Sequence, residues 1–340
     1  MDSRQLFCDA ICGKKTERPP LWIMRQAGRY LPEYIALKER YGGFLNLVKT
    51  PELALQAALQ PIERFGFDCA ILFSDILVLS EALGYGYNFI DGKGLVFKGR
   101  ISSKKDVENL NVDDVCEKLE YVLDALKLLR NALPKKAVLG FSASPFTLGA
   151  YLIEGESSKD FPRYKAFMKN EPELFAMLMQ KLSAAVGLYV KAQLKCNADA
   201  IQIFDSHSHL LCAENYWENS GKYIKAAFAE LPKNAKTILF ALNASDIFGE
   251  MLNVKASAYS VNCGVKLSRL KAAHNGRYAL QGNLNNAMLE FSTPRELAQK
   301  AAEIVEDMKN IGGHIFNLGH GITPNAKLEN VYALCNAVIK

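Results

Sequence analysis

Short continuous runs of apolar residues recur along this chain and alternate with longer helical patterns, and this alternation limits the folds open to it. Such runs predict strands that are buried on both faces, because a half-exposed strand would alternate apolar and polar residues. Eight predicted strands lie at 20–24, 69–73, 137–141, 200–204, 237–242, 259–262, 278–281 and 314–318. Eight strands that alternate with helices predict a (β/α)8 barrel, and the alternative is a doubly wound open sheet.

Start signals mark several of the intervening helices. Thr50 stands before a proline, and Thr293 stands three residues before Glu296 in a capping-box pattern. The helix that begins at this second signal is expected to end near residue 310, and segment 171–196 predicts a long amphipathic helix.

The chain carries no linker, repeat or low-complexity stretch, which predicts a single domain over residues 1–340. Residues 77–110 do not fit a minimal strand–helix unit, so we expect an insertion or a small hairpin over the barrel mouth. Its turn points would be Gly84, Gly86, Gly92 and Gly94. These glycines do not form a dinucleotide fingerprint, which needs a further glycine at the start of a helix.

Charge and composition argue against several partner classes. The net charge is +5 with scattered basic residues, which is too weak a signal to predict nucleic-acid binding. The first 15 residues lack the apolar core of a signal peptide, and no run approaches the roughly 18 apolar residues of a membrane span. Eight dispersed cysteines without a CxxC pair indicate a reducing compartment, so we expect a cytoplasmic protein.

Polar residues follow the predicted strands at the points where each strand ends. In a barrel these points meet at one face, where catalytic residues gather. The residues are Arg25, Gln26, Arg29, Ser74, Asp75, Ser142, Ser144, Asp205, Ser206, His207, His209, Asn243, Asn283 and His320. This convergence predicts an enzyme more strongly than any one of the residues does.

Two of these segments predict charge chemistry. Arg25 and Arg29 flank Gly28, and arginine matches carboxylates with paired donors, so the loop predicts an anion site unless Glu33 neutralises the arginines. Asp75 lies within apolar sequence and needs a partner if it is buried, so it is either part of a salt bridge or a functional carboxylate.

The polar residues after the other strands admit structural interpretations as well as functional ones. Ser144 or Thr147 could cap the next helix, and Tyr151 could be a half-buried core tyrosine. The segment 205–209, Asp-Ser-His-Ser-His, resembles a metal site or a hydrolase triad, but no nucleophile elbow supports the second interpretation. His320 stands between two glycines beyond the last strand, where it could simply bond to the backbone.

Five linked segments together resemble the uroporphyrinogen decarboxylase family. Residues 19–34 and 140–155 are similar to the first and second signatures of the family. Segments 73–77, 204–207 and 317–321 also match, in the same order and with the same spacing, so the resemblance covers nearly the whole chain.

The resemblance implies a (β/α)8 barrel, a homodimer, and a cleft at the C-terminal ends of the strands. It also implies conversion of uroporphyrinogen III to coproporphyrinogen III in haem biosynthesis without a metal or an organic cofactor. Carried over by position, Asp75 is the transition-state stabiliser, and Tyr151 and His320 join it as catalytic residues. The residues in contact with substrate would be Arg25, Gln26, Ala27, Gly28, Arg29, Asp75, Tyr151, Ser206 and His320.

The chain departs from the family pattern at three places that carry none of these residues. They are Asn243-Ala244-Ser245, Val261-Asn262-Cys263 and Asn285-Asn286. Two other functions remain open at this point. A corrinoid-dependent methyltransferase would need a zinc site with a His-x-Cys pattern and a later cysteine, whereas this chain reads His207-Ser208-His209. A non-catalytic tetrapyrrole-binding protein could dispense with Asp75.

Overall fold

A curved parallel sheet forms the centre of the computed structural model, which describes residues 1–90, 94–242 and 244–339. Within these residues the sheet has seven strands in the order β1-β4-β5-β6-β7-β8-β9, and every neighbouring pair is parallel. The strands are β1 Cys69–Ile71, β4 Ala137–Ala143, β5 Ala200–Asp205, β6 Thr237–Ala241, β7 Ala258–Ser260, β8 Ala279–Gln281 and β9 His314–Ile315. Apart from Ile71, all their residues are buried, as continuous apolar runs predict.

Seven of the predicted strands are thereby confirmed, with somewhat different bounds, whereas the strand predicted at 20–24 is wrong. Among the described residues, that segment makes only one parallel bridge, from Leu21 to Phe316. Pro20 has no N–H group to extend a ladder, and Arg25 turns the chain with a φ of 67°. The segment nevertheless lies between the two edges of the sheet. The Phe316 N–H donates to the Pro20 carbonyl at 2.9 Å, and the N–H of Asp68, just before β1, donates to the Leu21 carbonyl at 2.9 Å.

The Asp68 side chain holds this segment in place. It is only 1% exposed, and its two oxygens accept hydrogen bonds from the Arg18 guanidinium at 2.7 and 2.9 Å. The same carboxylate accepts from the Leu21 N–H at 2.8 Å and from the Ser3 hydroxyl at 2.7 Å. A buried carboxylate with this many donors is fully compensated for the loss of water. It joins the N-terminal segment to the start of β1.

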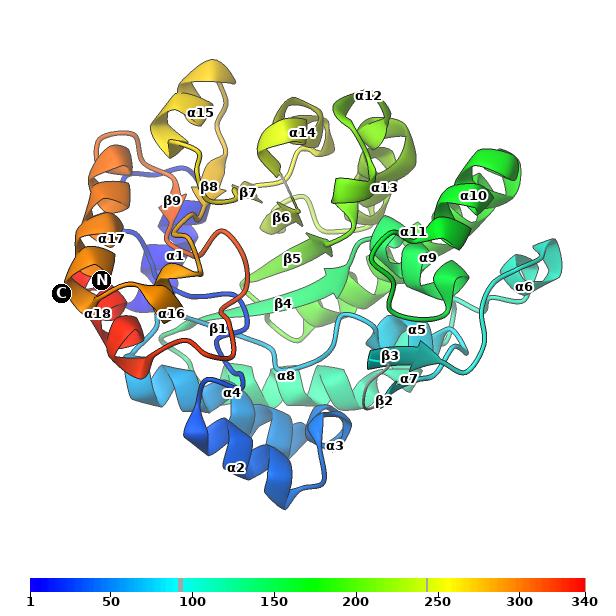
Figure 1. The fold of residues 1–340 in the computed structure, drawn as a ribbon, viewed down its shortest axis with the longest axis horizontal. Coiled ribbons are helices and arrows are strands. Elements are labelled where there is room, and N and C mark those ends of the chain that lie inside the picture. Colours follow the sequence, from blue (N-terminus) through cyan, green and yellow to red (C-terminus); the bar gives the residue numbers. More distant parts are fainter. Residues whose placement is uncertain (91–93, 243, 340) are drawn as a thin grey trace.

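Helices surround the curved sheet (Figure 1). They are α1 Ser3–Ile11, α2 Pro32–Arg40, α3 Phe44–Lys49, α4 Pro51–Phe65, α5 Val78–Ala82, α6 Lys104–Glu108, α7 Val115–Lys118, α8 Glu120–Ala132, α9 Pro145–Glu154, α10 Pro162–Asn170, α11 Pro172–Lys195, α12 Ala213–Tyr216, α13 Lys222–Ala229, α14 Ala244–Met251, α15 Leu267–Ala273, α16 Met288–Phe291, α17 Pro294–Met308 and α18 Leu328–Val338. The capping box of α17 is confirmed by mutual bonds between Thr293 and Glu296. Thr50 stands at the cap of α4 but makes no side-chain capping bond.

The insertion after β1 contains the expected hairpin. Strands β2 Tyr87–Ile90 and β3 Gly94–Phe97 are antiparallel, with Tyr87 opposite Phe97. Gly92 lies outside the described residues. The hairpin is fixed to the end of α9, because the Phe97 N–H donates to the Gly155 carbonyl at 2.9 Å and the Ile101 N–H donates to the Leu152 carbonyl at 2.8 Å.

One helix among the described residues, α11, is long and apolar enough to cross a bilayer by length and composition alone. Of its most apolar stretch, 56% is buried inside the molecule. A core helix of a folded domain has the same properties, so this helix is weak evidence for a membrane span.

Asp68→Asn should lower the free energy of unfolding by about 3 kcal/mol, because it removes the charge that compensates Arg18 at a buried position. The figure is at the lower end of the usual range, since Arg18 is itself 25% exposed. Urea denaturation measures the effect. Asp124→Asn, which breaks the exposed pair with Lys127, is the matched control and should change little. A loss below about 1 kcal/mol for Asp68→Asn would contradict the structural role assigned to this carboxylate.

Candidate active site

The loop after residue 24 presents two unpaired arginines. Arg25 and Arg29 are exposed, and neither forms an ion pair within the part of the chain that the structure describes. Glu33, the acid that could have neutralised them, instead binds Arg64 with contacts of 2.6 and 2.9 Å. Both guanidinium groups therefore remain available to an anion.

Arg25 is held against the loop that follows β9. A Cβ atom added at Gly321 would lie 2.6 Å from the Arg25 Cδ, so the arginine stem packs directly on this glycine. The side chain is open to water, yet enough protein surrounds it that burial and the nearby Arg29 lower the Arg25 pKa, while Tyr151 and Asp75 oppose the change. A charged side chain that contacts protein on one side and water on the other is exposed and still has a lowered pKa.

The residues between the two arginines divide into two kinds. Gln26 is buried, and its side chain donates to the Cys69 carbonyl at 3.1 Å and accepts from the Ile23 N–H at 3.3 Å. It therefore fixes the loop to β1, and its side chain is turned away from solvent. The N–H groups of Ala27 and Gly28 have no hydrogen-bond acceptor among the described residues. They are free to meet a ligand.

Asp75 lies four residues beyond the end of β1, in the turn that leads into α5. Its Oδ1 accepts a hydrogen bond from the Leu77 N–H at 3.0 Å, and no cation lies within ion-pair distance among the described residues. Burial raises the pKa of Asp75, whereas the Leu77 N–H, the Tyr87 hydroxyl and Arg25 oppose the rise. The salt-bridge interpretation of Asp75 is therefore wrong, and the carboxyl is only partly compensated.

Tyr151 extends from α9 toward the same group of residues. Burial and Asp75 raise the pKa of its phenol, and Arg25 lowers it, so all three side chains interact electrostatically. The ring packs edge-on against His207 with centroids 4.8 Å apart and lies 6.2 Å from Phe97 of the hairpin. Tyr151 is half-buried, as a core tyrosine would be, but its neighbours are the charged residues of the candidate site.

His320 lies beside Arg25 on the last loop. Burial first, and the positive charge of Arg25 second, lower the pKa of His320. Its ring stands 6.0 Å from that of Phe240 at the end of β6. Asn286, one of the departures from the family pattern, donates to the Gly321 carbonyl at 3.0 Å and so supports this loop.

The segment after β5 is mostly structural. The Asp205 carboxylate is fully buried and accepts from the hydroxyls of Ser144 and Ser220, each at 2.7 Å. Ser144 caps α9 by accepting from the Thr147 N–H at 2.9 Å, which confirms the capping interpretation. Ser206 follows Asp205 and is half-buried. These contacts tie the end of β5 to the helix that carries Tyr151.

The two histidines of this segment do not gather ligands around a common point. His207 is buried between the rings of Tyr151 and Phe161, whereas His209 is exposed, with ring centroids 5.9 Å apart. No group of three His, Cys, Asp or Glu side chains able to hold a metal occurs among the described residues. The interpretation of 205–209 as a metal site thus lacks further ligands there.

Two further departures from the family pattern form one hydrogen-bonded group. Asn262 accepts from the Ser245 N–H at 2.9 Å, and Asn283 donates to the Asn262 carbonyl at 2.9 Å and to the Val265 carbonyl at 2.8 Å. These side chains bond to one another and to backbone, so they stabilise the loops after β7 and β8. Asn243, also expected at a strand end, lies outside the described residues.

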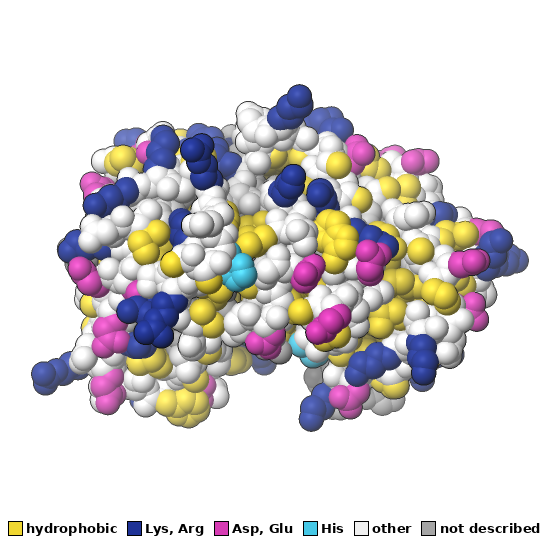
Figure 2. Space-filling view, turned by 90° about the horizontal axis from the view of Figure 1, so that it is seen from above, with side chains coloured by type: hydrophobic (Ala, Val, Ile, Leu, Met, Phe, Trp, Pro, Cys, Tyr) yellow, Lys and Arg dark blue, Asp and Glu magenta, His cyan; other side chains and the backbone are white. Residues whose placement is uncertain are grey.

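On the face shown in Figure 2, basic and acidic side chains are interspersed rather than segregated. A nucleic-acid surface would instead concentrate basic residues on one face or along one helix. The charges on this face agree with the scattered basic residues of the sequence.

The sequence missed one residue at the site, Tyr87 on the hairpin. Its side chain is 5% exposed, and its hydroxyl lies next to Asp75, where the two groups affect each other's pKa. No signal in the sequence identifies it, because the position depends on how the hairpin packs on the sheet. Among the predicted residues, Arg25, Asp75, Tyr151 and His320 come together, whereas no side-chain contact links Ser206 to them among the described residues.

Comparison with known proteins identifies the family. The sequence model described as "Uroporphyrinogen decarboxylase (URO-D)" matches residues 2–340. The chain belongs to the uroporphyrinogen decarboxylase family. It is 39% identical to the uroporphyrinogen decarboxylase of Legionella pneumophila (strain Corby), across 99% of this chain and 96% of that protein. It is 38% identical to the enzyme of the same name from Chlorobium limicola, across 99% and 98% of the two chains.

Solved structures confirm the fold at lower sequence identity. A methyltransferase from Methanosarcina mazei superposes with a TM-score of 0.82 at 23% identity, across 100% of this chain and 98% of the other. A B12-independent methionine synthase from Shewanella sp. W3-18-1 gives a TM-score of 0.57 at 13% identity, across 96% of each chain. At these identities the likeness concerns the fold alone.

His207 should make the protein sensitive to acid. Burial and the neighbouring His209 lower the pKa of His207 to about 3 from 6.5. Because the folded-state pKa is depressed, the neutral ring stabilises the fold above pH 6.5, and this contribution is lost as the pH falls below it. His207→Phe keeps an aromatic ring between Tyr151 and Phe161. Relative to wild type, this variant should gain about 2 kcal/mol in the free energy of unfolding between pH 8 and pH 5.

Urea denaturation at the two pH values tests this prediction. His209→Phe is the control and should give a smaller gain, because His209 is exposed and less desolvated. If the free energies of unfolding of wild type and His207→Phe differ by the same amount at both pH values, His207 is not buried as a neutral ring.

Proposed function

We propose that this protein decarboxylates the four acetate side chains of uroporphyrinogen III to methyl groups. The products are coproporphyrinogen III and CO2, and the reaction belongs to haem biosynthesis. Membership of the family supports the reaction class. The observation that carries the proposal is the half-buried, partly compensated Asp75 carboxyl beside Arg25 and Tyr151. This arrangement joins a fixed negative charge to free carboxylate-binding groups.

Decarboxylation of an acetate arm needs a place for the electrons that remain when CO2 leaves. Protonation of the pyrrole carbon that bears the arm makes a cationic, iminium-like ring that accepts them. CO2 then departs, and a second proton completes the methyl group. Because the substrate supplies its own electron sink, the reaction needs no pyridoxal-type cofactor.

Asp75 is the residue suited to stabilise the cationic ring. A fixed carboxylate near the pyrrole N–H groups interacts most strongly when positive charge develops, which favours the transition state over the ground state. At about 4 Å and an effective dielectric near 20, the interaction is roughly 4 kcal/mol, or about three decades in rate. This interaction energy is an upper limit on the catalytic effect, because hydrogen bonds to the neutral pyrroles already exist in the ground state.

Arg25, Arg29 and the free N–H groups of Ala27 and Gly28 are suited to bind the carboxylates of the substrate. Gln26 would act by holding this loop, and Ser206 would lie at the edge of the site. The proton donor has three candidates: His320, Tyr151 and a water held by Arg25. The lowered pKa of His320 disfavours its protonated form, and the raised pKa of Tyr151 makes its phenol a weaker acid.

We further propose that residues 1–340 form one domain and that the sheet closes into a (β/α)8 barrel through segment 20–24. The Leu21–Phe316 bridge and the hydrogen bond from Asp68 support closure. A polar chain also supports it, since the Trp22 indole donates to Gln281 at 3.0 Å and Gln281 donates to Gln202 at 3.0 Å. We propose in addition a cofactor-free homodimer in the cytoplasm, acting on a small polyanionic tetrapyrrole, with neither nucleic acid nor membrane as partner.

Anaerobic incubation with uroporphyrinogen III, followed by separation of the products by carboxyl count, tests the activity directly. We expect stepwise loss of four carboxyl groups, in the presence of a strong chelator as well as in its absence. Unchanged substrate would refute the activity. Activity that disappears with chelator and returns with zinc would refute the cofactor-free mechanism.

Asp75→Asn should lower kcat by at least about a hundredfold, the scale of one preorganised electrostatic group. Asparagine keeps the shape and an acceptor oxygen but loses the charge, so the loss should fall on kcat more than on KM. Steady-state kinetics measure this, and thermal unfolding should show little change or a gain, because a half-buried carboxylate no longer needs to be desolvated. Near-normal kcat in the folded variant would refute charge stabilisation by Asp75.

Gly321→Ala should raise KM by about tenfold, the cost of a misplaced charge-assisted hydrogen bond. The new methyl group would lie 2.6 Å from the Arg25 Cδ and must displace that side chain. Gly99→Ala is the matched control, since no atom of the described residues lies within 4 Å of its added Cβ atom. Equal kinetics for the two variants would show that the position of Arg25 does not matter for binding.

A further inference from the structure

The hairpin β2–β3 brings a second aromatic hydroxyl to the carboxyl of Asp75. Tyr87 opens β2, pairs with Phe97 across the hairpin, and is buried. The rings of Tyr87 and Phe97 have centroids 5.7 Å apart, and Phe97 in turn lies 6.2 Å from Tyr151. A continuous aromatic cluster therefore connects the hairpin to the candidate site.

The Tyr87 hydroxyl lacks a hydrogen-bond acceptor among the described residues. It is buried, and no hydrogen-bond partner meets the usual distance and angle limits among the described residues. A buried hydroxyl strongly favours such a partner. After burial, Asp75 has the largest influence on the Tyr87 pKa, and among the described residues the carboxyl accepts a hydrogen bond of normal geometry only from the Leu77 N–H. Catalytic hydrogen bonds are often long in ligand-free enzymes and shorten when substrate binds.

We propose that Tyr87 is a positioning residue that holds the Asp75 carboxylate through its hydroxyl and thereby couples the hairpin to catalysis. This proposal rests on the role of Asp75 in the proposed function. A phenol that donates to one carboxylate oxygen leaves the other oxygen directed at the substrate. It also favours the ionised form, which is the form that can stabilise a cationic pyrrole.

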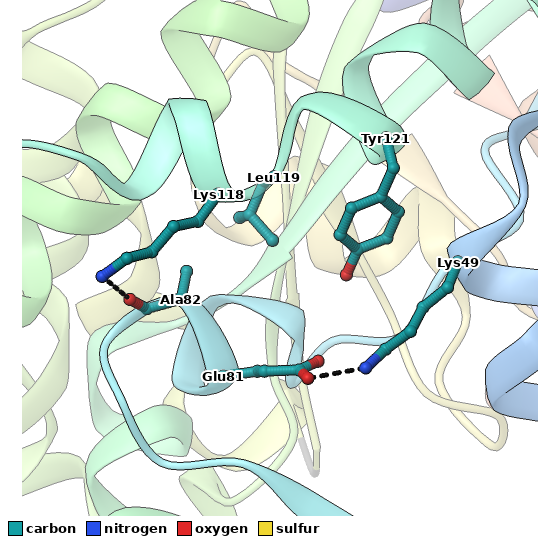
Figure 3. A pocket seen from close by; sticks show the side chains of 6 residues that line it. All are labelled: Lys49, Glu81, Ala82, Lys118, Leu119 and Tyr121. Atoms are coloured by element: carbon teal, nitrogen blue, oxygen red, sulfur yellow. Dashed lines mark hydrogen bonds and ion pairs between the residues drawn. The ribbon is translucent and has the colours of Figure 1, made fainter.

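Other charged and titratable groups face this pair from neighbouring elements. Arg25 faces Asp75 from the first loop, and Tyr151 faces it from α9. Tyr121 of α8 lies near both Asp75 and Glu81, and its hydroxyl also lacks a partner within hydrogen-bond geometry among the described residues. Figure 3 shows Tyr121 directed into a pocket where Glu81 binds Lys49 at 2.6 Å. Tyr87 is the hydroxyl whose hydrogen bonding lowers the Asp75 pKa, whereas Tyr121 and Asp75 interact through charge.

The hairpin can fix the position of Tyr87 because its second strand, β3, is bonded to the segment after α9. The Ser157 N–H donates to the Leu95 carbonyl at 2.9 Å, and Val96 forms an antiparallel bridge to Glu156. A change at the Tyr87 hydroxyl therefore need not move the backbone. Tyr87→Phe therefore removes the hydroxyl alone, since the ring and its packing on Phe97 stay in place.

Tyr87→Phe should lower kcat with uroporphyrinogen III by about tenfold, the effect of one hydrogen bond to a charged group, with KM changed less than about twofold. The acid limb of the pH profile of kcat should move to higher pH, because a donor that favours ionised Asp75 is lost. A residue that only braced the fold would not move this limb. Tyr85→Phe is the matched control on the same segment, and it should keep wild-type kinetics.

A double-mutant cycle separates this proposal from the one on which it rests. In an Asp75→Asn background, Tyr87→Phe should cause little further loss, because the carboxylate on which it acts is gone. A full additional loss, an unshifted pH profile, or an equal loss in Tyr85→Phe would overturn the role of Tyr87. Near-normal kcat in Asp75→Asn alone would overturn the role of Asp75 itself, which is a distinguishable result.

Discussion

The buried carboxylate of Asp68 is the interaction on which the site depends. From its place just before β1, it binds Arg18 and the Leu21 backbone, and so fixes the N-terminal segment between the two edges of the sheet. The arginine loop begins only four residues after Leu21. Asp75 follows the C-terminal end of β1, whereas Asp68 precedes its N-terminal end. The position of the arginine loop relative to Asp75 is therefore set by a contact at the opposite end of β1. Loss of the Asp68 contact would move the anion-binding loop and the Asp75 carboxyl apart.

The site itself is built from groups whose charges are not cancelled by neighbours. Arg25 and Arg29 have no ion-pair partner among the described residues, and the Asp75 pKa is raised because burial outweighs its few donors. A desolvated carboxyl with few donors, such as Asp75, lowers the stability of a folded protein, so its surroundings must hold it firmly. Gly321 supports the Arg25 stem, and the aromatic cluster around Tyr151 borders the Asp75 side. Rigid packing thus maintains an electrostatic arrangement that would otherwise relax.

Seven strands were predictable because continuous apolar runs have few other solutions in a chain of alternating strands and helices. The segment at 20–24 is also apolar, but a ladder needs N–H donors and an extended chain. Pro20 has no N–H donor, and the left-handed conformation of Arg25 turns the chain out of the extended direction. Arg25 and Asp75 were identified by motif, whereas Tyr87 was not, because docking of an inserted hairpin is a tertiary event. His207 and His209 resembled ligands in sequence, but the turn after β5 places one in the core and the other in solvent.

Arg25 adopts a left-handed backbone conformation, with a φ of 67°. For a residue with a side chain this conformation costs about 1–2 kcal/mol, whereas glycine adopts it freely. Stability alone would therefore favour glycine at this position, and a glycine there would abolish one of the two charges of the loop. The conformational strain at Arg25 records a conflict between folding and function. Selection for a more heat-resistant protein and selection for a working site would push this single position in opposite directions.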